Sequence, residues 1–238
     1  MSWRRWWATR RAPDDSPEAD DALASPWDAL RERMVNDQLL SRGIDDPELL
    51  RAFRAVPRHA FVASDDAYAD RALGIGAGQS ISQPYVVASM LRLARPPGGW
   101  RGAAVLEIGT GSGYGAAVLA ELGARVVTVE RHASLAATAR AALRDAGYDA
   151  VRVVVGDGSG GFAAGAPFDA VLVTAAGPSV PRPLVDQLSE DGGCLVMPVG
   201  TREQQWLTVV ERHGSVTSQR AVEPVVFVPL LGEHGFRS

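Results

Sequence analysis

The stretch VLEIGTGSGYGAAVLA, residues 105–120, decides the fold, because an apolar run passes through a glycine-rich turn into an apolar helical segment. A short, fully apolar strand followed by a helix is the repeating unit of a parallel sheet that is covered on both faces. Right-handed crossovers between such units give a doubly wound, mostly parallel, Rossmann-like α/β fold. The same alternation continues along the chain, with apolar runs at 103–108, 125–130, 151–155 and 168–176 and helical segments near 113–122, 134–146 and 181–189.

The last apolar runs, GCLVMPV, WLTVV and VVFVPL, follow one another without helical spacers, so we expect an antiparallel hairpin at one edge of the sheet. Upstream of the sheet, helical spacing predicts a helix over 28–41 that ends at Gly43, a second from Asp46 to Pro57, and a third from Pro84 to about residue 93. Residues 59–83 lack a clear period and are predicted to form a long ordered loop, a kind of segment that is often functional.

We therefore expect a disordered tail over residues 1–27 and a single domain over 28–238. Within that domain, residues 28–98 form a helical segment on the substrate side, and residues 99–238 form the Rossmann-like core.

The composition of the chain excludes several classes of function and disfavours others. The 238 residues carry a formal charge of −4, which offers no general attraction to nucleic acid or to an anionic membrane. The single cysteine excludes an internal disulfide, and the absence of lysine excludes Schiff-base chemistry. The basic, aromatic start MSWRRWWATRR is followed by an acidic stretch and not by the apolar core of an export signal. We expect a cytoplasmic monomer without stable membrane association.

Three features collect at the predicted carboxyl ends of the strands, where such sheets bind their ligands. Gly109, Gly111 and Gly113 stand at the turn from the first strand into its helix. Glu130 ends the second strand, about 20 residues on, where a carboxylate takes the hydroxyls of a ribose. Asp157 ends the third strand, where it could meet an adenine amine. This arrangement predicts a nucleoside ligand.

The spacing of the glycines indicates which nucleoside. They read G-x-G-x-G, whereas the dinucleotide fingerprint is G-x-G-x-x-G/A, and Tyr114 occupies the position of its third small residue. The tight turn is kept and the pyrophosphate fingerprint is not, so S-adenosylmethionine is the best candidate. Helix N-terminal amides favour its carboxylate. Glu107, Glu130 and Asp157 suit its ammonium and sulfonium groups.

With these residues in place, the chain resembles the protein-L-isoaspartate O-methyltransferase family, a family of class I S-adenosylmethionine-dependent methyltransferases. The resemblance spans residues 34–232, and two of its segments, GQSISQPY and VLEIGTGSGY, are close to family-specific. The other matching segments are MVNDQLLSRGI, VPRHAFV, VTVE, GDG, APFDAVLVTAA, LVMPVG and FVPLLG.

The resemblance implies methyl transfer to the free α-carboxylate of L-isoaspartyl residues in damaged proteins and peptides, which starts repair through a succinimide. It implies that Ser82 is the active-site residue. The cofactor contacts that it implies are Gln79, Ser80, Ile81, Ser82, Gly109, Gly111, Gly113, Glu130, Asp157 and Gly158. We add Glu107 to this set from its charge and place.

This sequence departs from the family pattern at three positions. Ser80 replaces the usual threonine and keeps the hydroxyl. Gly74 follows Leu73 where the family often has proline, and Val226 stands where it often has arginine, so any role of that arginine is absent.

Simpler interpretations of the same residues stay open at this point. Ser82 could be a plain helix N-cap, His59 could be structural, and Arg58 could meet the substrate backbone or cap a helix carbonyl. The remaining histidines and Cys194 have no metal-ligand spacing, so no metal site is predicted.

The alternative functions are also open. They are methylation of an aspartate side chain in a dedicated precursor peptide, a non-catalytic module that binds an adenosyl ligand, and a methyltransferase for small molecules or nucleic acid. The acidic balance of the chain disfavours nucleic acid.

Overall fold

The computed structural model describes residues 25–237, so most of the predicted tail lies outside the described residues. The first helix, α1 (Pro26–Arg33), begins two residues before its predicted start, because Ser25 forms a capping box with Asp28. The helix continues through a π-helical turn, η1 (Met34–Leu39), and a 3₁₀ turn, η2 (Leu40–Arg42). Gly43 then ends it with a positive φ of 82°, as predicted.

The segment between this helix and the sheet is more regular than its sequence indicated. Helix α2 (Pro47–Ala55) is capped by Asp46 and followed by the 3₁₀ turn η3 (Arg58–Ala60). The predicted loop contains an antiparallel hairpin, β1 (Leu73–Gly76) with β2 (Gln79–Ile81), so the interpretation as a loop throughout was wrong. The predicted helix after it is confirmed as α3 (Pro84–Leu93).

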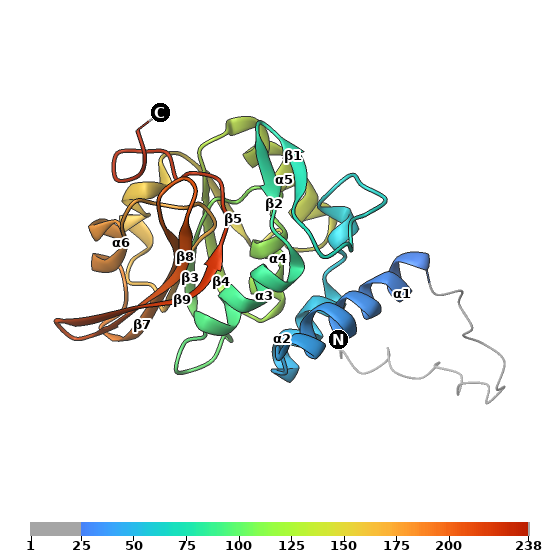
Figure 1. Cartoon of the computed structure of the whole chain (residues 1–238), viewed down its shortest axis with the longest axis horizontal. Coiled ribbons are helices and arrows are strands. Elements are labelled where there is room, and N and C mark those ends of the chain that lie inside the picture. Colours follow the sequence, from blue (N-terminus) through green and yellow to red (C-terminus); the bar gives the residue numbers. More distant parts are fainter. Residues whose placement is uncertain (1–24, 238) are drawn as a thin grey trace, which may run out of the picture.

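The seven-stranded sheet has the order β5-β4-β3-β6-β7-β8-β9, with β3 to β7 parallel and β8 and β9 antiparallel (Figure 1). The strands are β3 (Ala104–Ile108), β4 (Arg125–Glu130), β5 (Arg152–Val155), β6 (Ala170–Val173), β7 (Asp191–Gly200), β8 (Gln205–His213) and β9 (Val216–Val225). The helical segments between them are α4 (Tyr114–Glu121), α5 (Ala133–Asp145), η4 (Gly158–Gly160), η5 (Ala163–Gly165) and α6 (Arg182–Asp186). The chain leaves β3 toward β4 and β5 and then returns to β6 on the other side, so the switch point lies between β3 and β6. The doubly wound fold and its antiparallel edge are confirmed.

The last strand is not where the apolar pattern placed it. β9 runs through the largely exposed polar residues before Val225, whereas the apolar run 225–230 leaves the sheet. The Gln205 side chain holds this run, since it accepts a hydrogen bond from the Phe227 N–H at 2.7 Å and donates one to the Phe227 carbonyl at 3.2 Å. Two backbone hydrogen bonds with Ala176 then keep the run beside the end of β6.

Buried side chains pack on both faces of the sheet. The larger cluster joins Met34 and Phe53 of the N-terminal helices to Tyr114 of α4 and to Val105 of β3. The second cluster includes Leu106, the next residue of β3, together with residues of β6, β7 and α6. Adjacent strand residues thus point to opposite faces, as a covered parallel sheet requires. The division of the domain near residue 98 stays a prediction.

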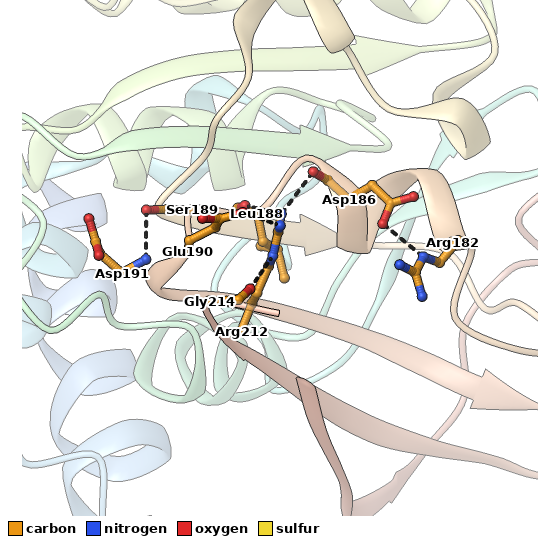
Figure 2. Close-up of polar contacts among 8 residues, drawn as sticks. All are labelled: Arg182, Asp186, Leu188, Ser189, Glu190, Asp191, Arg212 and Gly214. Carbon is orange, nitrogen blue, oxygen red and sulfur yellow. Dashed lines mark hydrogen bonds and ion pairs between the residues drawn. The ribbon is translucent and has the colours of Figure 1, made fainter. Parts of the chain in front are cut away.

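Arg212 of β8 fastens α6 to the turn that joins β8 and β9 (Figure 2). Its guanidinium donates to the carbonyls of Asp186, Leu188 and Gly214 at 2.9–3.1 Å and to the Glu190 carboxylate at 2.7 Å. Two of these bonds satisfy the carbonyls of Asp186 and Leu188, at and just beyond the end of α6. A helix of five residues forms few hydrogen bonds within itself, so its last carbonyls need such partners. Among residues 25–237, no helix combines the length and apolar character needed to cross a membrane.

Candidate active site

A cavity lies at the carboxyl ends of β3, β4 and β6, next to the switch point. It is lined by nine of the eleven residues predicted from the sequence, namely Gln79, Ser80, Ile81, Ser82, Glu107, Gly109, Gly111, Glu130 and Gly158. The β1–β2 hairpin and the start of α3 therefore come to the same place as the glycine turn. Segments that are distant in the sequence build one site.

Arg58 holds the loop that carries Ser82. The Arg58 side chain is fully buried, with 0% of its surface exposed, and its Nη2 donates to the Ser82 carbonyl at 2.7 Å. Its Nε donates to the Ala67 carbonyl at 2.8 Å, and its guanidinium carbon lies 4.9 Å from the centre of the Tyr114 ring. The sequence left two interpretations of Arg58 open, contact with the substrate backbone or capping of a helix carbonyl. In the structure Arg58 binds carbonyls, but these belong to loops and not to the end of a helix.

The Ser82 hydroxyl is not a helix cap. The N-cap of α3 is Gln83, and no side chain forms a capping hydrogen bond there. Pro84 in the first turn has no N–H to satisfy, which lowers the need for a cap. Within residues 25–237 the Ser82 hydroxyl forms no hydrogen bond, and Ser82 lines the cavity. Its hydroxyl is thus available to a ligand.

The glycine turn is shaped by close backbone contacts. Gly109 has a φ of 94°, and a Cβ on it would collide with the Thr174 hydroxyl, which donates to the Gly109 carbonyl at 2.8 Å. Glu130 accepts hydrogen bonds from the N–H of Gly111 at 3.0 Å and from the N–H of His132 at 2.9 Å. Each carboxylate oxygen has a second lone pair, so Glu130 can still accept two ribose hydroxyls.

Glu107 is a buried acid at the floor of the cavity. Burial raises the pKa of Glu107 to about 8, against a smaller opposing effect of the Thr128 hydroxyl, which donates to it at 2.7 Å. The negative charge of Glu130 raises that pKa further. A Cβ on Gly115 would collide with the other Glu107 oxygen, so this residue must be small. Within the described part of the chain Glu107 forms no ion pair, and a cationic ligand group would stabilise its charged form.

His59 has a structural environment. Its ring stacks on Trp27 with centroids 4.8 Å apart, and its Nδ1 lies 2.8 Å from the Tyr68 hydroxyl. Burial lowers the pKa of His59, and the nearby charge of Arg31 acts in the same direction. The structural interpretation is confirmed, and His59 lines neither cavity described here.

Two predicted contacts lie beside the cavity and do not line it. One Asp157 oxygen accepts from the Ser159 N–H and hydroxyl, and the other accepts from the Glu233 N–H at 2.8 Å. These bonds help hold the pKa of Asp157 below its usual range, against the opposing effect of burial. Gly113 begins α4 but packs toward Leu143 of α5. Both residues support the backbone next to the cavity, and their role as direct cofactor contacts stays a prediction.

Sequence reasoning missed several lining residues. Thr174 follows β6 directly, and its position at the carboxyl end of a strand was a signal that could have identified it. The run after β9 also lines the cavity, through residues 228–231. The apolar sequence of this run was interpreted as a strand of the sheet, so no sequence signal indicated that the run lines the cavity.

A second, open groove adjoins the cavity. Ser80, Ser82, Thr174 and Val228 line both. The groove continues between the start of α3 and the residues around the beginning of β8 and the end of β9. The cavity at the strand ends therefore meets, at Ser80 and Ser82, a groove that can take a larger molecule.

The sequence was also compared with models of known protein families. The model of the protein-L-isoaspartate(D-aspartate) O-methyltransferase family matches residues 30–235. This chain belongs to that family.

Related proteins of this family cover almost the same length. The protein-L-isoaspartate O-methyltransferase of Methanoregula boonei is 50% identical over 211 residues, covering 87% of this chain and 95% of that protein. That of Methylorubrum populi is 52% identical over 209 residues, covering 86% and 96%. A solved protein-L-isoaspartate O-methyltransferase superposes with a TM-score of 0.77 at 27% identity, covering 86% of this chain and 67% of that one.

S-adenosylmethionine is the methyl donor of the protein-L-isoaspartate(D-aspartate) O-methyltransferase family. The lining of the cavity is chemically compatible with this donor: Glu107 is a buried acid that forms no ion pair within residues 25–237, and Glu130 has free lone pairs that could accept ribose hydroxyls. The side chains of Ile108, Val129 and Leu230 add apolar lining. A Plasmodium falciparum structure described as a putative member of this family, in complex with S-adenosyl-L-homocysteine, shares the fold, with a TM-score of 0.73 at 22% identity over 84% of this chain and 98% of that one.

Proposed function

We propose that this enzyme transfers a methyl group from S-adenosylmethionine to the free α-carboxylate of L-isoaspartyl residues in damaged proteins and peptides. The observation that carries the proposal, beside family membership, is that the cavity at the strand ends meets a second groove at Ser80 and Ser82. Methyl transfer needs a donor and an acceptor that meet at such a point. The resulting ester closes to a succinimide, which hydrolyses in part to normal aspartate.

The chemistry asks little of the protein beyond binding and orientation. An α-carboxyl has a pKa of about 3.3–3.7, so at neutral pH it is already a nucleophile and needs no general base. The donor supplies a methyl carbon on a sulfonium, whose carbon–sulfur bond breaks as the carboxylate oxygen bonds to that carbon. The proposed role of Ser82 is to orient the carboxylate oxygen, with Ser80 supporting it.

The charges around the junction agree with an orienting role. No arginine or histidine lines the groove as far as residues 25–237 describe it. A strong cation at the carboxylate would stabilise the ground state more than the transition state, in which the negative charge is being lost. Neutral hydroxyls hold the carboxylate without that penalty. Glu107 and Glu130 would hold the ammonium and ribose of the donor. The other proposed cofactor contacts are Gln79, Ser80, Ile81, Ser82, Gly109, Gly111, Gly113, Asp157 and Gly158.

The test compares two synthetic peptides that differ only in L-isoaspartate or L-aspartate at one position. Base-labile label from labelled S-adenosylmethionine should appear on the isoaspartyl peptide alone. Label on the aspartyl peptide would favour the dedicated-precursor alternative. Label on neither peptide, with donor binding intact by calorimetry, would overturn the proposed activity and favour a non-catalytic module.

We also propose a monomer in the cytoplasm. The one cysteine, Cys194, is a free buried thiol, and free thiols are typical of proteins in reducing compartments. Sedimentation at catalytic concentrations, with activity measured in the same sample, tests the monomer, and fractionation of cells tests the compartment.

A further inference from the structure

The groove beside the active-site serines has a wall that the methyl-transfer chemistry does not use. Trp206 lies in it with 50% of its surface exposed, and Val226 with 87% exposed, whereas Gln205 and Leu207 on either side of Trp206 are 4% and 0% exposed. Trp206 is thus the outward-facing residue of a buried stretch. A half-exposed tryptophan that lines a groove is typical of a surface that binds a ligand or another protein.

This wall is preformed. Trp206 stands on β8, paired with Val199 of β7 on one side and Pro224 of β9 on the other. The two side-chain hydrogen bonds of Gln205 to Phe227 fix the segment that carries Val226. A ligand that contacts this wall therefore does not have to order it, which lowers the entropic cost of binding.

The groove is continuous with the site of methyl transfer. The groove and the cavity share four lining residues, Ser80, Ser82, Thr174 and Val228. A peptide whose isoaspartyl carboxylate lies at Ser82 has neighbouring residues that must leave the junction, and the groove that contains Trp206 is the open space next to it. Continuity thus favours the substrate's own flanking residues as the occupant.

The charge and polarity of the groove favour an apolar flanking residue. Glu203 is the one charged side chain among its described lining residues, and Val86, Pro224 and Val225 add apolar surface. A carboxylate placed here would face Glu203, and a nucleic acid would find no arginine to pair with its phosphates. An aromatic ring can stack on Trp206 and bury apolar area as well.

We propose that Trp206 is a specificity-determining residue, which binds an aromatic or large apolar side chain flanking the isoaspartate of the substrate peptide. This inference rests on the proposed function. It predicts that the enzyme distinguishes among isoaspartyl peptides by a neighbour of the damaged residue, and that acidic neighbours are disfavoured by Glu203.

The test uses a set of isoaspartyl peptides in which one phenylalanine is placed at each position in turn, in an otherwise serine and glycine background. With the wild-type enzyme, one or two positions should raise kcat/KM by roughly tenfold over serine, as expected for an aromatic contact with added apolar burial. Trp206→Ala should remove that preference, and Trp206→Phe should keep most of it. Glu203→Gln should improve the peptide with aspartate at the same position.

Controls separate recognition from folding. Each variant should bind S-adenosylhomocysteine with wild-type affinity by calorimetry, because Trp206 does not line the donor cavity. Val216→Ala, at an exposed apolar residue of β9 outside the groove, should leave the profile unchanged.

A flat profile in the wild type, or a preference that survives Trp206→Ala, would overturn the assignment of Trp206 while the proposed activity stands. If no isoaspartyl peptide is methylated although the donor binds, the proposed function fails and this inference fails with it.

Discussion

Replacement of Arg58 by lysine should reduce turnover and stability together, while donor binding is largely kept. The guanidinium bridges two loops, since it donates to the carbonyls of Ser82 at 2.7 Å and Ala67 at 2.8 Å. A lysine ammonium is a point charge on a flexible stem and cannot reproduce this fixed two-pronged geometry. Arg58→Lys should therefore leave one buried carbonyl without its donor.

The magnitude follows from that unpaired carbonyl. A buried acceptor left unsatisfied costs about 1–3 kcal/mol. At a central value of about 2 kcal/mol, the Tm of a domain of this size should fall by roughly 4–8 °C. The effect on catalysis acts through position, because the Ser82 carbonyl and hydroxyl belong to the same residue. A displacement of about 1 Å at a reacting group costs up to roughly 100-fold in rate, so kcat should fall by about 10- to 100-fold.

The assay combines thermal unfolding, steady-state kinetics on an isoaspartyl peptide, and calorimetry with S-adenosylhomocysteine. Arg71→Lys is the matched control, because Arg71 forms an exposed ion pair with Asp66, and such pairs contribute about 0–1 kcal/mol. The reasoning would be refuted if Arg58→Lys kept the wild-type kcat and Tm. It would also fail if donor affinity fell as much as kcat, since that would indicate general loosening and not a displaced Ser82.

Four further substitutions test other parts of the structure. Ser82→Ala should lower kcat by roughly 10- to 100-fold, the worth of a hydrogen bond to a charged group, with little change in donor affinity by calorimetry; full activity would exclude the orienting role. Glu107→Gln should flatten the pH dependence of the donor-free Tm: a pKa raised to about 8 from the usual 4.5 means that the folded state holds its proton more tightly, so the stability that Glu107 contributes is present below pH 4.5 and is lost as the pH rises toward 8. Equal slopes in the two proteins would contradict this. Glu130→Gln should weaken S-adenosylhomocysteine binding by roughly tenfold, because it exchanges two acceptor oxygens for one, and an unchanged Kd would remove Glu130 from the donor site. Arg212→Ala should lower stability to urea by about 2 kcal/mol and leave kcat unchanged, since Arg212 lines neither cavity; a loss of kcat in the folded protein would contradict this separation.

The parallel part of the fold was predictable because its strands are buried on both faces and read as continuous apolar runs. β9 was missed because an edge strand with exposed polar residues carries no such signal. The run 225–230 was misassigned for the opposite reason: it is apolar because it packs over the site, and the Gln205 side chain supplies partners that a neighbouring strand would have supplied. Tertiary contacts, which no local pattern encodes, decided both cases.

The cavity was predicted where one segment carries its own signal, as at the glycine turn and Glu130. The roles of Arg58 and Thr174 depend on which carbonyls the fold brings within reach, and these come from residues 24 and 65 positions away. Asp157 does follow a strand end as predicted, but no local pattern indicated that one of its oxygens accepts a hydrogen bond from the N–H of Glu233, 76 positions away. Residue type and strand position indicate where a ligand binds, and only the packed structure gives each partner.

The two cavities share four residues, and this division bears on how the enzyme can change over evolution. A substitution at Ser80, Ser82, Thr174 or Val228 touches both ligands at once, so drift at these positions puts the methyl-transfer reaction itself at risk. Trp206 and Val226 line the groove alone. The enzyme's preference among damaged proteins can therefore change through single substitutions at Trp206 or Val226, while its ability to bind the donor is kept.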